Sequence, residues 1–495
     1  MSDREALARL ERKGARAVPR AWWPMAGGAA LVFAAATYSR ADADLWGHLR
    51  YGLDALEAGR LTSVDPYSFT QDRPWINHEW MSEVQTAVAW WLGGVAGLVL
   101  LKAALVFGAF WLMWDALRGA ALGVRLALML FAAVGTVHIT SAVRPQAWTF
   151  LAFGLLCHAL AFRRLDHRRW LPVLFALWAN VHGGWVVGLG VLGVWAAAES
   201  LHDRDARRQW LWLAPISALA TVATPYGWRL WEFLLTTVRP ERSIEEWQPI
   251  FTKDAGFWGP WVVAVMLGVW AVRSLRVRRL PVMAVLLMLA WSSFRVMRIG
   301  SLFVEASVIF LAPAVIARWP ACLPVLPVSR SRAEPLVAGY LFAAAGAAAI
   351  WIGLHTLTCL PFGGPWAPEM APVRLLSAAP AGRVVTFFDW GQYALWHLGP
   401  RLAVSMDGRR ETVYTDARLR EHDAIVLGEP EGLETLARWR AEYVWLPARS
   451  TATRDWLVAN GYRLVYSSDE SFVAVRDDLP PLGTSAVPAR PCFPG

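Results

Sequence analysis

Residues 21–49 read AWWPMAGGAALVFAAATYSRADADLWGHL, an apolar run that ends a few residues before two aspartates and a histidine. The run 21–38 is long enough to cross a bilayer, since a transmembrane helix needs roughly 17 to 25 apolar residues. Carboxylates are costly in or beside hydrocarbon, so ionisable groups at such a place indicate a functional site. The stretch therefore predicts a membrane protein with Asp42 and Asp44 at the mouth of its first helix.

The composition supports a chain that lies largely in a membrane. It has 495 residues, of which 56% are hydrophobic and 18% are charged, whereas soluble domains carry about 25% charged residues. The 31 tryptophans suit a protein with many membrane–water interfaces. The net charge of +9 comes from arginines in short clusters between apolar runs. That pattern indicates membrane topology and no nucleic-acid partner.

Further apolar runs predict a polytopic α-helical membrane protein with about eleven transmembrane helices. Their expected ranges are 21–38, 94–115, 124–140, 146–162, 170–184, 186–199, 209–225, 258–273, 279–294, 300–317 and 336–355. The block 170–199 is either one long helix or two short ones. The positive-inside rule places four arginine clusters in cytoplasmic loops only if this block crosses twice, with the N-terminus inside. These clusters are 163–169, 202–208, 273–279 and 329–332.

This topology divides the chain into a cytoplasmic segment 1–20, a membrane domain 21–356 whose first outer loop is 39–93, and an extracytoplasmic C-terminal part. From 368 to 478, helix-like and strand-like runs alternate, which predicts a small α/β domain. The strand-like runs are 382–389, 401–407, 441–447, 462–467 and 471–476, and the helix-like runs are 371–379, 416–428 and 432–440. The tail 479–495 is expected to be disordered. Cys359 and Cys492 would both lie outside, where a disulfide between them is compatible with the sequence but not required by it.

Polar residues that could carry chemistry gather on the outer side in this topology. The first outer loop contributes Asp42, Asp44, His48, Asp65, His78 and Glu79. Other polar residues lie at membrane depth or at helix ends, and these are Arg144, Asn180, His182, Glu246, Arg295 and Arg298. Each has a structural alternative, such as a bond to a neighbouring helix or an arginine reaching toward lipid headgroups. Their convergence on one leaflet favours a site.

This mixture of groups suits a lipid-linked phosphosugar. Acids at the water boundary can deprotonate a hydroxyl group or hold a divalent cation. Arginines just inside can bind a phosphate through bidentate hydrogen bonds. Such a donor places its tail in the bilayer, its phosphate at the interface and its sugar in water. A single displacement, with an acid as general base and the phosphate leaving toward arginine, would invert the anomeric centre.

A family resemblance rests on several motifs together. The stretch DADLWGHLRYGLDALEAGRLTSVDPYSFT, followed by PWINHEW, RPQAWTF, WANVHGGW, PYGW, EEW and FRVMR, resembles a bacterial multi-span group of the GT-C glycosyltransferase superfamily. That superfamily includes protein O-mannosyltransferases, aminoarabinose transferases and catalytic subunits of oligosaccharyltransferase. The later run FFDWGQYALWHLGPRLAVSMDGRRETVY is similar to the extracytoplasmic domain of the same group. The resemblance covers about 40 to 475 and implies a GT-C-like protein of the bacterial inner (plasma) membrane.

The resemblance implies a polyprenyl-phosphate sugar donor, an acceptor that is a glycan, a lipid or a protein, and an acid of the first outer loop as catalytic base. On matching position that base is Asp42 or Asp44. Phosphate binding falls to Arg144, Arg295 and Arg298. Acceptor binding or support falls to His48, Asp65, His78, Glu79, Asn180, His182 and Glu246. Some members use a divalent metal, and Mg²⁺ or Mn²⁺ is compatible with, but not demanded by, Asp42, Asp44 and His48.

Two departures from the family pattern bear on the substrate rather than on the fold. Gly47 stands where the group often has a second tryptophan, and Thr224 stands where asparagine is usual before PYG.

Two other functions stay open. One is a transporter or flippase of lipid-linked or anionic solutes, and the other is a non-catalytic assembly protein of the cell envelope whose α/β domain recruits a partner. In that domain four charged residues are interpreted first as turn residues at strand ends, with acceptor binding as the alternative. They are Asp389, Asp407, Arg409 and Arg410.

Overall fold

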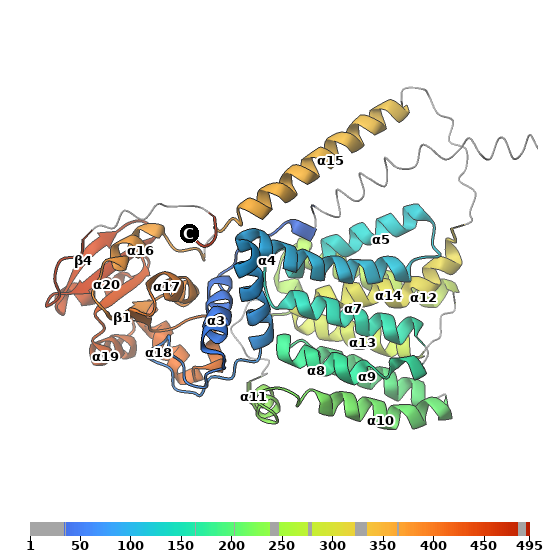
Figure 1. The fold of residues 1–495 in the computed structure, drawn as a ribbon, viewed down its shortest axis with the longest axis horizontal. Helices are drawn as coiled ribbons and strands as arrows, with labels where there is room; N and C mark the ends of the chain where they lie inside the picture. Colours follow the sequence, from blue (N-terminus) through green and yellow to red (C-terminus); the bar gives the residue numbers. More distant parts are fainter. Residues whose placement is uncertain are drawn as a thin grey trace, which may run out of the picture.

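The structure is a computed structural model, which describes residues 34, 36–163, 165–201, 203–237, 247–275, 280–321, 334–363, 366–483 and 492–495. A bundle of helices and a smaller α/β domain lie side by side, with helix α3 (Leu45–Ala58) between them (Figure 1). The mostly helical chain with a small C-terminal sheet agrees with the predicted fold class at this level. The expected first helix, 21–38, falls mostly outside the described residues.

All but one of the helices from α4 to α15 overlap a predicted apolar run, and the exception is α11. These helices are α4 (Trp80–Ala116), α5 (Leu122–Gly135), α6 (Val137–Thr140), α7 (Gln146–Phe162), α8 (Leu171–Val181), α9 (Trp185–Ser200), α10 (Arg204–Ala220), α11 (Arg229–Thr237), α12 (Ala255–Leu275), α13 (Leu280–Arg295), α14 (Gly300–Arg318) and α15 (Glu334–Thr358). The block 170–199 forms two helices, because the chain leaves the helical conformation at His182, where α8 ends. This break is the one that the positive-inside argument required.

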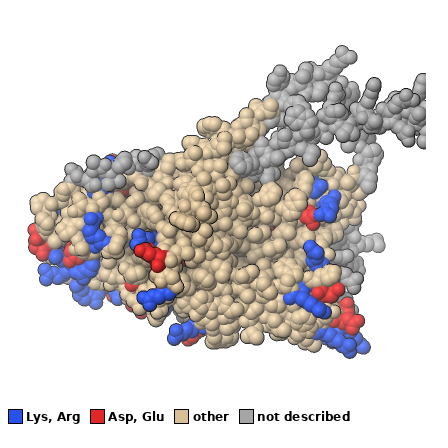
Figure 2. Space-filling view, viewed as in Figure 1, with Lys and Arg blue, Asp and Glu red and all other residues tan. Residues whose placement is uncertain are grey.

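The bundle has the composition of a membrane domain. Within the described residues, three helices are long and apolar enough to cross a membrane, namely Trp80–Ala116, Ala255–Arg273 and Met297–Arg318. Helix α14 packs against α4, α7, α12 and α13 and is the most buried of the three. In Figure 2, charged side chains of the described residues gather over the α/β domain and over the far end of the bundle, with an uncharged band between them on this face. Such a band suits contact with lipid.

Helix α4 begins at Trp80, inside the predicted first outer loop 39–93, and bends at Gly94, next to the residue where that loop was expected to end. The φ of Gly94, +56°, favours glycine. The start of α4 was not predicted to be helical, because residues 80–86 are of mixed polarity. Near the start of α4, Gly52 of α3 lies against the backbone of Glu83, where an added Cβ would sit 2.1 Å from the carbonyl oxygen. The close approach of α3 to α4 therefore depends on this glycine.

The α/β domain contains a five-stranded sheet in the order β2-β1-β3-β5-β4. Its strands are β1 (Gly382–Thr386), β2 (Leu402–Val404), β3 (Tyr443–Pro447), β4 (Tyr462–Ser467) and β5 (Ser471–Arg476). The first three strands pair in parallel and the last two join antiparallel. The accompanying helices are α16 (Met370–Ser377), α17 (Gly391–Leu398), α18 (Asp416–Leu427), α19 (Pro430–Trp439) and α20 (Thr451–Ala459). All five strands correspond to predicted runs, whereas α17 and α20 were not predicted.

A buried ion cluster joins the α/β domain to the first outer loop. The guanidinium of Arg409 donates two hydrogen bonds to Asp65, each 2.8 Å long, and further bonds of 2.9 and 2.6 Å to Asp407. It also lies over three aromatic rings of the loop region, at 4.9–5.1 Å from the ring centroids of Tyr51, Tyr67 and Trp75. Asp407 and Arg409 follow the end of β2, as expected of turn residues, and the structure shows in addition that both are buried in this ion cluster.

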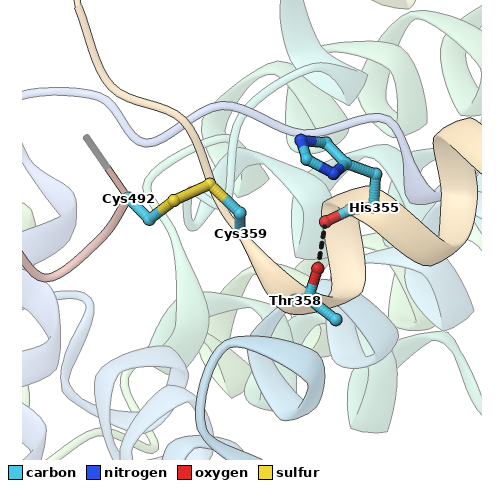
Figure 3. Close-up of a disulfide and its surroundings, with 4 residues drawn as sticks. All are labelled: His355, Thr358, Cys359 and Cys492. Carbon is cyan, nitrogen blue, oxygen red and sulfur yellow. Dashed lines mark hydrogen bonds between the residues drawn. A yellow bond between two sulfur atoms is a disulfide. The ribbon is translucent and has the colours of Figure 1, made fainter. Parts of the chain in front are cut away.

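The chain end is fastened by a disulfide between Cys359 and Cys492 (Figure 3). Phe493 packs against the rings of Trp46, Trp90 and Trp396, and the carbonyl oxygen of Pro494 accepts a 2.8 Å hydrogen bond from Trp46 Nε1. Residues 484–491 of the tail lie outside the described residues. The last four residues are thus packed against α3, in contrast to the expected disorder, because a disulfide and three aromatic contacts hold them.

Candidate active site

Two acids and one arginine meet at the start of α3. Arg144 lies in the loop before α7, and its Nη2 is 2.6 Å from Asp44 Oδ2, while its Nε contacts Asp42 Oδ2. The backbone amide of Asp44 donates a 3.0 Å hydrogen bond to Asp42 Oδ1. Burial raises the pKa of Asp42 and Arg144 lowers it, and the balance leaves the pKa at about 6. Asp42 is therefore mostly ionised at neutral pH, yet basic enough to accept a proton.

Backbone pairing holds the two segments of this acid pair together. The amide of Arg40 donates a 2.8 Å hydrogen bond to the carbonyl oxygen of Ser141, and that of Ala41 donates a 3.0 Å bond to Pro361. The chain before Asp42 and the chain before Arg144 therefore run side by side.

The α/β domain closes the site from its other side. Gly408 lies against Asp44, where an added Cβ would sit 2.4 Å from Oδ1. The amide of Gly47 donates a 3.2 Å hydrogen bond to Gln392 Oε1, and a Cβ at Gly47 would overlap that side chain. Gly47, which stands where the GT-C group often has a tryptophan, is therefore the residue of α3 that contacts Gln392 of α17.

A second cluster surrounds Glu79, which precedes α4. Its carboxylate lies 3.6 to 3.9 Å from the Nε2 atoms of three histidines, which are His48, His78 and His182. His182 Nε2 is also 3.2 Å from Arg298 Nη2. Burial raises the pKa of Glu79, but the surrounding positive groups outweigh it and lower the pKa overall. An anionic Glu79 thus connects the α3 side of the site to Arg298.

His48 is held in its charged form within this cluster. Its Nδ1 is 3.0 Å from Glu83 Oε1. Burial lowers the pKa of His48, but the bond to Glu83 and the charge of Glu79 outweigh burial and raise it from 6.5 to about 9. The folded pKa exceeds the unfolded one, so the stabilisation is complete below pH 6.5 and is lost as the pH rises toward 9.

We therefore expect thermal unfolding of the lipid-reconstituted protein to occur at progressively lower temperature between pH 7 and pH 9.5. His48→Gln should flatten this dependence and destabilise the protein at pH 7 by roughly 1.5–3 kcal/mol, the range for a charged hydrogen bond. His167→Gln is the matched control, since the His167 side chain is 63% exposed beside Asp166. An unchanged pH dependence in His48→Gln would contradict the assignment of a charged His48.

A cavity of about 480 Å³ opens next to the acid pair. Its lining includes the cations Arg144, Lys253 and Arg298, the acid Asp254, and the polar residues His138, Ser141, Gln146 and Ser301. The apolar part of the lining includes Ile139, Phe257, Pro260, Trp261 and Val304. His138 stacks on Phe257 with 3.9 Å between ring centroids. A cavity lined both by cations and by apolar groups suits an anionic group attached to a lipid.

The sequence did not single out Lys253 or His138. The chain has only three lysines, and Lys253 is the one lysine between α11 and α12, which was the available signal. His138 gave no signal, because a histidine within an apolar run is usually a core residue.

Several predicted residues lie apart from the acid pair. Asp65 belongs to the Arg409 cluster described above. Asn180 accepts a 2.9 Å hydrogen bond from Trp80 Nε1 and donates to the carbonyl oxygens of Ala176 and Ala223, so its amide links helices. Arg295 is exposed at the end of α13 and does not line the cavity. Glu246 lies outside the described residues.

Asp42, Asp44 and His48 are not arranged to bind Mg²⁺ or Mn²⁺ in this structure. Asp42 and Asp44 both face the guanidinium of Arg144, and His48 is engaged by Glu83. Within the described ranges, no group of three or more histidine, cysteine, aspartate or glutamate side chains could hold a metal ion. We derive no step through Mg²⁺ or Mn²⁺.

Comparisons with known proteins add little. No protein-family model matches the chain, and no curated protein matches it. Among solved structures, the chain is similar to the arabinofuranosyltransferase AftD from mycobacteria, at 16% sequence identity and a TM-score of 0.46. The match covers 93% of this chain and 42% of that one, so the chain spans less than half the length of that protein. A similarity of this degree assigns no substrate and no residue role.

Proposed function

We propose that the chain is an integral-membrane glycosyltransferase that moves a sugar from a polyprenyl-phosphate donor to an acceptor on the extracytoplasmic face. The observation that carries this proposal is that Arg144 pairs with both acids and also lines a cavity that holds further cations and apolar side chains. The acceptor is a glycan, a lipid or a protein.

The proposed topology is multi-pass in the bacterial inner membrane, with about eleven helices, a cytoplasmic N-terminus and an extracytoplasmic α/β domain. Three observations support it. The helices from α4 to α15, apart from α11, overlap the predicted apolar runs. Charged side chains avoid a band across the bundle on the face seen in Figure 2. The disulfide between Cys359 and Cys492 requires an oxidising compartment.

In the proposed reaction, Asp42 acts as general base and takes the proton from the acceptor hydroxyl. The hydroxyl oxygen attacks the anomeric carbon, the bond to the phosphate oxygen breaks, and the configuration inverts. Arg298 and Lys253 stabilise the departing phosphate through charge-assisted hydrogen bonds. Arg144 orients Asp42 and Asp44 by pairing with both, and Asp44 thereby neutralises part of the positive charge of the Arg144 guanidinium. Asp42 is favoured over Asp44 because its pKa of about 6 suits a base at neutral pH.

Polyprenyl phosphate is the product left by every donor of this class, so its binding tests the proposal without knowledge of the sugar. Arg298→Gln and Lys253→Gln should each weaken binding of polyprenyl phosphate roughly tenfold, the loss expected for one charge-assisted contact of about 1.4 kcal/mol. Binding is measured by titration into protein in lipid nanodiscs. Arg118→Gln is the matched control, since the Arg118 side chain is 77% exposed and pairs with Asp115.

Equal affinity in all variants would contradict the placement of the donor phosphate. Movement of the donor across vesicles without covalent transfer would instead favour the transporter alternative.

A further inference from the structure

Lys102 is a buried cation that neither the sequence motifs nor the proposed reaction uses. It lies in α4, beyond the bend at Gly94, and only 1% of its surface is exposed. Its Nζ donates three hydrogen bonds of 2.8 Å each, to the carbonyl oxygens of Ala36, Tyr38 and Thr140. All three protons of the ammonium are therefore used, and every acceptor is a backbone carbonyl.

These carbonyls belong to the C-terminal ends of two helical segments. The amide of Tyr38 donates to the carbonyl of Ala34, which makes Ala36 and Tyr38 part of a final turn, and Thr140 is the last residue of α6. Carbonyls at a helix C-terminus lack intrahelical partners, and the helix dipole makes this end negative. A single ammonium placed between two such ends satisfies the carbonyls and offsets both dipoles without needing a carboxylate.

Lys102 and the carbonyls of Ala36, Tyr38 and Thr140, together called the Lys102 clamp, fix the register of the two chain segments that carry the candidate site. Asp42 follows Tyr38 by four residues, and Arg144 follows Thr140 by four residues. Between the clamp and these residues, Arg40 pairs with Ala142 in a parallel bridge. The two segments therefore leave Lys102 together, run in parallel and end in the contact between Asp42 and Arg144.

We propose that Lys102 is a positioning residue that sets Asp42 opposite Arg144 by clamping the segments before them. The inference that this contact matters for sugar transfer rests on the proposed function, whereas the clamp itself is a statement about structure. Losing it should allow the segments to slide or separate, and a misplacement near 1 Å can lower a reaction rate about 100-fold.

The structural test is a cross-link across the bridge. Cysteines introduced by Arg40→Cys and Ala142→Cys should form a disulfide rapidly under mild oxidation when Lys102 is present. Lys102→Met removes the ammonium at nearly constant volume and should slow this cross-link at least tenfold. Lys102→Gln keeps two N–H donors and provides a second variant if Lys102→Met fails to fold. Its cross-linking rate should lie between those of the parent and of Lys102→Met. A cross-linking rate equal to that of the parent in either folded variant would overturn the inference.

The functional test separates kcat from KM. Lys102→Met should lower kcat roughly 10- to 100-fold and leave the donor KM within about threefold, because the phosphate cations Arg298 and Lys253 lie on other segments. Transfer is measured with whichever member of a panel of polyprenyl-phosphate hexoses and pentoses is active with the parent protein.

The matched control is Arg168→Met at another part of the bundle. Arg168 is also buried and donates to the carbonyl oxygens of Ala159, Leu160 and Arg163 near the end of α7. Its loss should lower stability without changing kcat, KM or the cross-linking rate. A kcat in Lys102→Met equal to that of Arg168→Met would overturn the positioning role. If the parent protein transfers no sugar, the proposed function fails, while the cross-linking rates still decide the clamp.

Discussion

Asp42→Asn should lower kcat for sugar transfer by roughly 10²- to 10⁴-fold, the range expected for loss of a general base. The amide keeps the size of the carboxylate but cannot accept a proton, so the donor KM should change little. Asp44→Asn should have a smaller effect, because Asp44 acts through Arg144, from which it lies 2.6 Å away. Initial rates with the active polyprenyl-phosphate sugar measure both variants.

Asp54→Asn is the matched control for these substitutions. Asp54 lies on the same helix, α3, but accepts hydrogen bonds from Tyr67 and Arg50 and takes no part in the acid pair. Its loss should leave kcat within about twofold if the fold is kept, since exposed pairs contribute little. Full activity of Asp42→Asn would show that the base lies elsewhere.

Arg409→Met should destabilise the protein by roughly 3–5 kcal/mol, because it leaves the charges of Asp65 and Asp407 buried without a partner. Both carboxylate side chains are fully buried, whereas the Arg409 side chain is 5% exposed. The loss should loosen the α/β domain from the outer loop and lower the denaturant midpoint of the reconstituted protein. Combining Arg409→Met with Asp65→Asn and Asp407→Asn should recover part of the stability, since the uncompensated charges are then absent.

Arg383→Met provides the comparison for an exposed ion pair. Arg383 pairs with Glu442 at 3.2 Å, but its side chain is 41% exposed, so its loss should cost at most about 1 kcal/mol. Equal effects of Arg409→Met and Arg383→Met would contradict the description of Arg409 as the anchor between the two parts of the molecule.

The sequence predicted the helices well, because the length of an apolar run sets the span of a membrane helix. It also predicted all five strands, which are short and rich in β-branched and aromatic residues. It missed the first part of α4, since residues 80–93 are less uniformly apolar than the run that follows. It missed the bond between Arg409 and Asp65, because their separation of 344 residues leaves no local pattern to read.

Within the candidate site, the position of a residue relative to an apolar run predicted that it belongs to the site. Contacts between residues far apart in the sequence could not be predicted. The position of Asp42 and Asp44 after an apolar run pointed to a site, and the structure places Arg144 against both. Arg295 carried the same expectation as Arg298 but lies outside the cavity, because α13 ends at Arg295 and the extended backbone at Val296 separates the two side chains. Lys102 offered a signal that was not used, namely a single cation inside a long apolar helix.

The cavity beside the acid pair is proposed to hold the phosphate of a lipid-linked donor, and the proposed function depends most directly on this placement. The most direct measurement is a cryo-electron microscopy structure of the protein in nanodiscs with bound polyprenyl phosphate. We predict phosphate density between Arg298 and Lys253, with the prenyl chain leaving along Phe257, Pro260 and Trp261, and with Asp42 facing the phosphate. Phosphate density outside this cavity, with Asp42 facing away from it, would contradict the proposed position of the donor phosphate and the role of Asp42.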